Sequence, residues 1–143
     1  MTEPKYYLEI ESTPNNLITV EEFVNYFAKE IGIPESRMNG LMLSVTEATT
    51  NAIKHANKND ESKLVKINVK VENNKVYISV KDEGVGFDPT QIPDPTEPEN
   101  LMKDSGRGVY LMKFYMDDVQ YNLTPTGTET ILVLNLDNEL ENG

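Results

Sequence analysis

The sequence predicts an α/β fold, a two-layer sandwich in which a mixed or antiparallel sheet carries its helices on one face. Two segments, residues 64–80 and 119–136, alternate apolar and polar residues around a turn, which is the pattern of a β-hairpin. Two segments before the first hairpin place apolar residues at helical spacing. The resulting order of elements, β-α-α-β-β-α-β-β, implies this sheet and this placement of the helices.

The first half of the chain is predicted to form one strand and two helices. Residues 5–11, with the sequence KYYLEIE, are expected to form the strand. Thr19 and Glu22 form a capping-box pattern, which predicts that the first helix begins there, and Gly32 ends it. The second helix is predicted over about residues 34–58, with a core face formed by Leu41, Val45, Ala48, Ala52 and Ala56.

The second half is predicted to contain two hairpins separated by a long loop and a short helix. The first hairpin turns at Asn73-Asn74. Residues 87–105 contain four of the chain's eight prolines and exceed the usual length of a connection, which predicts a lid or an insert. A short helix is predicted over residues 108–116, and the second hairpin follows it. Residues 137–143 are expected to form a polar tail.

The composition excludes several classes of protein. The chain has 143 residues, enough for one domain, and 13 Lys and Arg against 24 Asp and Glu give a net charge of −11. This charge argues against nucleic acid and anionic membranes as partners, because both require a basic surface. The absence of Cys excludes a thiolate metal site and a thiol nucleophile. Because the sequence shows neither a signal peptide nor a membrane-spanning run, we expect a cytoplasmic protein.

The second predicted helix carries a polar stripe beside its apolar face. Its members recur at spacings of three and four: Ser44, Glu47, Asn51, His55 and Lys58. A solvated face is the ordinary explanation of such a stripe, and a packed or capping role is the ordinary explanation of His55 alone. Small neighbouring residues, and a carboxylate one turn from an amide, favour a site instead. An Asn oxygen suits Mg²⁺, and a carboxylate beside it could take a proton from a hydroxyl or water.

Three glycine-containing motifs accompany this stripe, and each is weak by itself. Residues 82–86, Asp-Glu-Gly-Val-Gly, end a predicted strand, where such residues usually make a turn. Their functional interpretation is that Asp82 accepts a hydrogen bond from an exocyclic amine while the glycines let a flat ring approach the backbone. Residues 106–108, Gly-Arg-Gly, open a predicted helix and are either a hinge or a phosphate-binding helix start. Residues 127–128, Gly-Thr, lie in the second hairpin.

Taken together, the order and context of the four motifs resemble the four boxes of the Bergerat-fold ATPases, the superfamily of gyrase, histidine kinases and mismatch-repair ATPases. The segments LMLSVTEATTNAIKHAN, VKDEGVGFDP and GRGVYLMKFYMDDV are similar to those of the anti-sigma-factor serine kinases of bacterial partner switching. The resemblance covers residues 5–136. It implies a histidine-kinase-like ATP-binding domain over residues 1–136, with residues 87–105 as its ATP lid.

The resemblance also implies a role for each motif residue. Glu47 is implied to be the general base, and Asn51 a ligand of the Mg²⁺ that bridges the phosphates of ATP. Asp82 would accept a hydrogen bond from the adenine amino group, with support from Thr128. The other residues implied to contact or surround the nucleotide are His55, Gly84, Gly86, Lys103, Ser105, Gly106, Arg107 and Gly108.

Members of this family transfer the γ-phosphoryl group of ATP to a Ser or Thr of a small antagonist protein, bind a sigma factor, and usually form homodimers. The resemblance therefore implies ATP and Mg²⁺ as cofactors, and an antagonist, a sigma factor and a second copy of the chain as partners. Asp104 stands where some members carry an Arg that reaches the γ-phosphate; Arg107 and Lys103 are the candidate replacements. Two alternatives stay open: a non-catalytic ATP-binding regulatory module, which Asp104 favours, and a histidine-kinase catalytic domain acting in trans.

Overall fold

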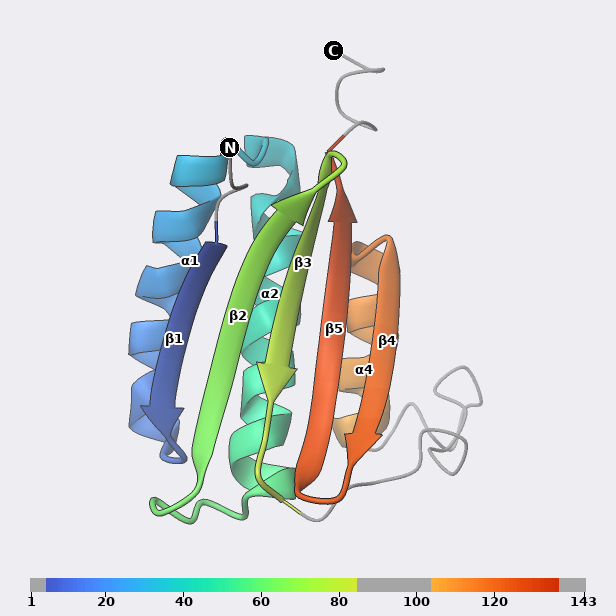
Figure 1. Ribbon diagram of the computed structural model, residues 1–143. Helices are drawn as coiled ribbons and strands as arrows, with labels where there is room; N and C mark the ends of the chain where they lie inside the picture. The colour runs from blue at the N-terminus through green and yellow to red at the C-terminus, as the bar shows by residue number, and fades with distance from the viewer. Residues whose placement is uncertain (1–4, 85–103, 137–143) are drawn as a thin grey trace.

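The computed structural model describes residues 5–84 and 104–136, with the side chains of 104–109 left aside, and it confirms the predicted two-layer α/β sandwich (Figure 1). In chain order the strands and helices are β1 (Lys5–Glu11), α1 (Leu17–Ile31), α2 (Glu35–Thr50), β2 (Leu64–Glu72), β3 (Lys75–Lys81), α4 (Asp104–Tyr115), β4 (Asp118–Thr124) and β5 (Gly127–Asn135). A 3₁₀ turn, η1 (Pro14–Asn16), precedes α1, and a π-helical turn, η2 (Asn51–Ala56), directly follows α2. In this described part of the chain, no helix is long and apolar enough to cross a bilayer.

The sheet has five strands in the order β1-β2-β3-β5-β4, and every neighbouring pair is antiparallel. Of the two arrangements predicted, the sheet is therefore antiparallel and not mixed. The β2–β3 hairpin turns at Asn73 and Asn74, whose φ angles of 54° and 62° are those of a tight hairpin turn that Asn tolerates. Figure 1 shows α1, α2 and α4 together behind one face of the sheet.

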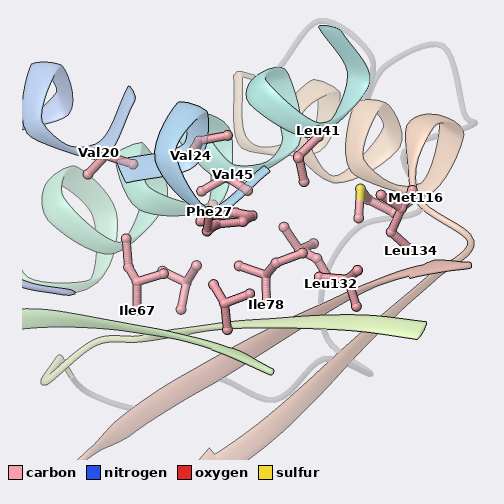
Figure 2. Close-up of a cluster of buried hydrophobic side chains, with 14 of the residues drawn as sticks. Val20, Val24, Phe27, Leu41, Val45, Ile67, Ile78, Met116, Leu132 and Leu134 are labelled. Carbon is pink, nitrogen blue, oxygen red and sulfur yellow. The ribbon is translucent and has the colours of Figure 1, made fainter. Parts of the chain in front are cut away.

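The core lies between the sheet and these helices. Alternate strand residues point toward the helices, as the period of two in the sequence predicts. Figure 2 shows Val20, Val24 and Phe27 from α1, and Leu41 and Val45 from α2, opposite Ile67, Ile78 and Leu132 from the strands; all are at most 1% exposed. Burying such a side chain stabilises the fold by about 1.5–3 kcal/mol. The two layers are therefore held together by an apolar interface.

Helix α4 is fixed against α2 by close packing and by one cation. A Cβ added at Gly40 would lie 2.7 Å from the ring of Tyr115, so the two helices approach each other closely at this glycine. Arg37 donates from Nη2 to the carbonyl of Tyr115 and to the carboxylate of Asp117, both at 3.3 Å. These contacts set the position of α4, whose first turns contain the second glycine motif.

Two predicted helix starts are wrong. Helix α1 begins at Leu17, directly after η1, so the chain is already helical before the predicted capping box at Thr19, and its N-cap Asn16 makes no side-chain cap hydrogen bond. Helix α4 begins at Asp104 instead of Gly108, because a polar Asp-Ser pair is favoured in a first helical turn. The last two residues of the predicted loop are therefore helical. The rest of that loop and the tail at 137–143 lie outside the described residues.

The second predicted helix also differs from its prediction, because it does not continue as an α-helix to Lys58. It changes to the π-helical turn η2 at Asn51, and the N–H of Asn57 donates to the carbonyl of Ala52, five residues earlier, at 2.9 Å. Lys58 lies beyond the turn with a φ of 53°. The predicted polar stripe consequently does not stay on one face: Ser44 is buried, Glu47 and Asn51 are half-buried, and His55 and Lys58 are exposed.

Candidate functional site

The carboxylate of Asp82 directly follows β3 and is buried beside the start of β5. Its residue is 7% exposed. The Oδ1 atom accepts hydrogen bonds from the backbone N–H of Thr128 at 3.0 Å and of Gly84 at 3.1 Å. The backbone N–H of Asp82 donates in turn to the carbonyl of Thr128 at 3.0 Å. Asp82 and Thr128, which were predicted to act together, are therefore joined by two hydrogen bonds.

The pKa of Asp82 differs from that of a solvated carboxyl group. Burial raises this pKa above its ordinary value of 3.8, while the hydrogen bonds from Thr128 and Gly84 and the charge of Lys63 act in the opposite direction. A carboxylate kept out of water at the end of a strand costs free energy, and such groups concentrate at functional sites. This carboxylate is therefore the first candidate for a ligand contact.

Two glycines allow the backbone to pack closely around Asp82. A Cβ at Gly127 would lie 2.1 Å from the carbonyl oxygen of Asp82, and a Cβ at Gly84 would lie 2.2 Å from the carbonyl oxygen of Ala56. Both distances are far below a van der Waals contact. The missing side chain of Gly84 thus serves contact between the loop and the end of η2. The sequence interpretation had assigned it to the approach of a ligand ring.

The polar residues of the helical segment lie on the chain that leads to this contact. Glu47 is in the last turn of α2, Asn51 is the first residue of η2, and both are half-buried. His55 lies in η2 and is exposed, and Ala56, the next residue, is the one that meets Gly84. The structure therefore joins the segment that carries Glu47 and Asn51 to the loop that carries Asp82.

One residue of this site was missed by the sequence interpretation. Asn57 follows η2 and is 0% exposed. Its Nδ2 donates to Oγ of Ser12 at 2.8 Å and to the carbonyl of Leu64 at 3.2 Å, and its Oδ1 accepts from the N–H of Glu83 at 2.9 Å. The available signal was an Asn directly after an apolar helix face. Its partners, however, come from three segments that only the fold brings together.

The second glycine motif, Gly-Arg-Gly at residues 106–108, lies at the start of α4. Ser105, Gly106, Arg107 and Gly108 belong to the first two turns of this helix. The first N–H groups of a helix have no partner within it, and they attract anions such as phosphate. Gly86 and Lys103 lie outside the described residues.

The donor set is compatible with a magnesium ion that also binds phosphate. Mg²⁺ prefers oxygen ligands, keeps several waters and commonly uses one or two protein groups together with substrate phosphates. The half-buried Asn51 amide provides an oxygen of this kind. In the described residues, no group of three or more His, Cys, Asp or Glu side chains is placed to hold a metal. The residues present thus fit an ion held mainly by its substrate.

Comparison with known proteins adds independent information. The family model described as "Histidine kinase-like ATPase domain" matches residues 10–134. The anti-sigma F factor of Geobacillus stearothermophilus is 32% identical over 117 residues, which are 79% of this chain and 79% of that protein. The serine-protein kinase RsbW of Oceanobacillus iheyensis is 31% identical over 101 residues, which are 66% of this chain and 64% of that protein.

Solved structures match the fold. The RsbU and RsbW domains of a Mycobacterium tuberculosis protein superpose with a TM-score of 0.69 at 18% identity, covering 93% of this chain and 32% of that one. The catalytic domain of the histidine kinase ThkA superposes with a TM-score of 0.57 at 14% identity, covering 92% of this chain and 97% of that one. At these identities the structures support the architecture alone.

Proposed function

This chain belongs to the family of histidine kinase-like ATPase domains, as its motifs predicted, and from that membership we propose that it is an ATP-dependent serine/threonine protein kinase that also binds a sigma factor. The names of its relatives, serine-protein kinase and anti-sigma F factor, support the two halves of the proposal. The observation that carries it is the buried Asp82 carboxylate, held by Thr128 and Gly84 beside the end of the helical segment that bears Glu47 and Asn51.

Asp82 is proposed to recognise the adenine base. Both backbone N–H groups that hold the carboxylate donate to Oδ1, and we propose that Oδ2 is the atom that accepts from the ligand. The exocyclic amine of adenine is a donor, whereas guanine has a carbonyl oxygen at the same position. A buried acceptor facing that carbonyl would be left unpaired, which costs about 1–3 kcal/mol. The site should therefore prefer ATP to GTP.

Asn51 and the start of α4 are proposed to hold the phosphates. The Asn51 oxygen would be a ligand of Mg²⁺, whose contribution is to neutralise the charge on the phosphate oxygens. The first N–H groups of α4, including those of Gly106 and Arg107, would receive further phosphate oxygens. A chain with a net charge of −11 can bind a polyanion in this way, because backbone amides carry the contact.

Glu47 is proposed to be the general base of the transfer. Its carboxylate takes the proton of a Ser or Thr hydroxyl of the protein substrate, while that oxygen forms a bond to the γ-phosphorus. The bond from the γ-phosphorus to the bridging oxygen breaks, and ADP leaves. Such a transfer depends on positioning and charge compensation, so no protein nucleophile is needed.

The partners proposed are a small antagonist protein that carries the phosphorylated Ser or Thr, and a sigma factor held by the same domain. A second copy of the chain is proposed to complete a homodimer. We expect these proteins to meet in the cytoplasm. We expect no direct contact with nucleic acid, because the net charge of −11 repels a phosphate backbone.

Incubation with γ-labelled ATP, Mg²⁺ and a candidate antagonist protein tests the transfer. We expect label on a Ser or Thr of the antagonist. Glu47→Gln, which keeps the shape of the side chain, should abolish transfer while ATP affinity stays within about twofold. ATP binding without transfer to any partner would reject the kinase and support a non-catalytic ATP-binding module, the function that Asp104 favours.

The metal assignment has its own test. Asn51→Ala should weaken ATP binding in the presence of Mg²⁺ by roughly 10- to 100-fold, the usual cost of disturbing a metal site. The same variant should bind ATP in EDTA about as weakly as the unsubstituted chain does. Calorimetric titration under both conditions measures the difference. An unchanged affinity in Mg²⁺ would remove Asn51 as a ligand.

A further inference from the structure

In the described part of the chain, the side chain of Asn57 joins the helical segment to three others: the residue after β1, the start of β2 and the loop that follows Asp82. Its amide nitrogen donates to Ser12, which follows β1, and to the carbonyl of Leu64 at the start of β2. Its amide oxygen accepts from the N–H of Glu83, the residue directly after Asp82. All three described hydrogen bonds are long-range or medium-range in sequence, so they form only in the folded protein.

These bonds belong to a closed network. The carboxylate of Glu83 accepts a hydrogen bond from the N–H of Leu64, whose carbonyl accepts from Asn57, which in turn accepts from the N–H of Glu83. Ser12 extends the network, because its Oγ donates to the carbonyl of Lys63 at 2.6 Å. Each polar group restrains its neighbours, so a shift of the Asn57 amide displaces the backbone at Glu83.

The π-helical turn η2 determines where Asn57 points. A π turn takes one residue more than an α turn, and in a helix of 3.6 residues per turn one extra residue rotates all following side chains by about 100°. Without this extra residue, Asn57 would leave the helix in another direction. π-helical turns inside or at the end of an α-helix occur frequently at functional sites. Figure 1 shows the end of the α2 segment beside the end of β3 and the start of β5.

We infer that Asn57 is a positioning residue for nucleotide recognition, which fixes the Asp82 loop relative to the helical segment that carries Glu47 and Asn51. The inference rests on the proposed function, because it takes the Asp82 loop to be the part of the site that binds adenine. Asp82 is held from the β5 side by Thr128, and Asn57 holds the residue after it from the helix side. Adenine recognition and phosphate binding are thereby kept in one geometry.

The test compares ATP with GTP for Asn57→Ala. We expect ATP affinity to fall about tenfold or more while GTP affinity changes little, so that the preference for ATP decreases. A variant that is merely less stable lowers the folded fraction equally for both nucleotides and leaves their ratio unchanged. Val76→Ala, a truncation of a fully buried side chain at the opposite end of β3, is the matched control and should keep the ratio.

A milder variant serves if Asn57→Ala does not fold. Ser12→Ala removes one acceptor of the Asn57 amide and keeps its bonds to Leu64 and Glu83. It should lower the ATP-to-GTP ratio of affinities in the same direction by about two- to fivefold. An unchanged ratio in the folded variants would overturn the inference.

Asp82→Asn, measured in parallel, separates this inference from the proposed function. If Asp82→Asn reduces the preference for ATP and the Asn57 and Ser12 variants do not, only the positioning role fails. If the unsubstituted chain shows no preference, or if Asp82→Asn leaves it intact, the adenine assignment itself fails, and the role of Asn57 fails with it.

Discussion

The two ends of the sheet are built from different residues. Where β3 ends and β5 begins, four buried polar side chains lie close together: Ser12, Asn57, Asp82 and Thr128. At the other end of the same two strands, Val76 pairs with Leu134, and both are buried and apolar. An apolar end stabilises a fold at no cost in polar desolvation, whereas each buried polar group has to be hydrogen-bonded. The polar end therefore marks the part of the sheet that meets a requirement other than stability.

The largest effect on stability should come from the apolar end. Leu134 is 1% exposed. Because Leu134→Ala removes buried methyl groups and leaves a cavity in the core, the free energy of unfolding should fall by about 2–5 kcal/mol. The Kd for ATP of the folded variant should stay unchanged. Denaturant unfolding and calorimetry below the transition measure the two quantities. Loss of ATP affinity in folded protein would show that the ends are not separable.

Substitution of a glycine at the polar end should lower the free energy of unfolding by less than Leu134→Ala does, but it should abolish ATP binding. Gly127→Ala drives a methyl group into the carbonyl of Asp82, so the backbone has to shift, at a cost of about 1–3 kcal/mol. Gly32→Ala is the control, because Gly32 has a φ of 85° with nothing within 4 Å of the added Cβ, and its strain of about 1–3 kcal/mol lies after α1. Similar destabilisation with ATP binding lost only at Gly127 is the expected outcome. Equal binding by both variants would contradict it.

Asp82→Asn should leave stability almost unchanged and alter recognition alone. The amide oxygen of Asn can keep the bonds from Thr128 and Gly84, so the free energy of unfolding should change by less than about 1 kcal/mol. The amide nitrogen replaces an acceptor with a donor, and the preference for ATP over GTP should fall about 10- to 100-fold. Competition of the two nucleotides for one site provides the measurement. A preference that survives the substitution would exclude Asp82 from base recognition.

The smallest expected effect is on the pH dependence of stability. It can be compared for two carboxylates, those of Glu129 and Asp82. The hydroxyl of Ser79 donates to Glu129 at 2.5 Å and holds the pKa of Glu129 below its ordinary 4.5, with help from Asn122 and nearby lysines. Because the folded pKa is lowered, this stabilisation is present above pH 4.5 and is lost as pH falls through the folded pKa. Ser79→Ala should therefore flatten the loss of stability below pH 4.5.

The contribution of Asp82 to stability depends on pH in the direction opposite to that of Glu129. Since burial raises its folded pKa above 3.8, the native state keeps a proton that the unfolded chain releases, and stability falls as pH rises through that window. Asp82→Asn should remove this fall. Chemical denaturation between pH 3.5 and 7 follows both variants, and identical pH profiles for the two would contradict the assignment.

Much of the fold could be predicted because its signals are local. The alternation of Val65, Ile67 and Val69 and the Asn73-Asn74 turn are contained in one short stretch, and the structure has the hairpin they predict. The family could be predicted because its motifs are contiguous. The change to η2 could not, since the apolar pattern through Ala52 and Ala56 has the period of an ordinary α-helix.

The role of Asn57 was out of reach for the same reason. Its hydrogen bonds to Ser12 and Glu83 span 45 and 26 residues, so no local pattern contains them. The function predicted for Gly84 was incomplete because its contact with Ala56 depends on the tertiary structure. The motifs thus led to a prediction of the site residues, and only the structure showed which backbone groups hold Asp82 and Gly84 in place.

Amide chemical shifts on titration with Mg-ATP test the central claim most directly, because one spectrum reports on both ends of the sheet. We expect the amide resonances of Gly84, Asn57 and Thr128 to shift in a saturable way. Those of Asn74 and Leu134, at the apolar end, should stay in place. Saturable shifts confined to the apolar end, or no shift at the polar end at saturating Mg-ATP, would contradict a nucleotide site built around Asp82.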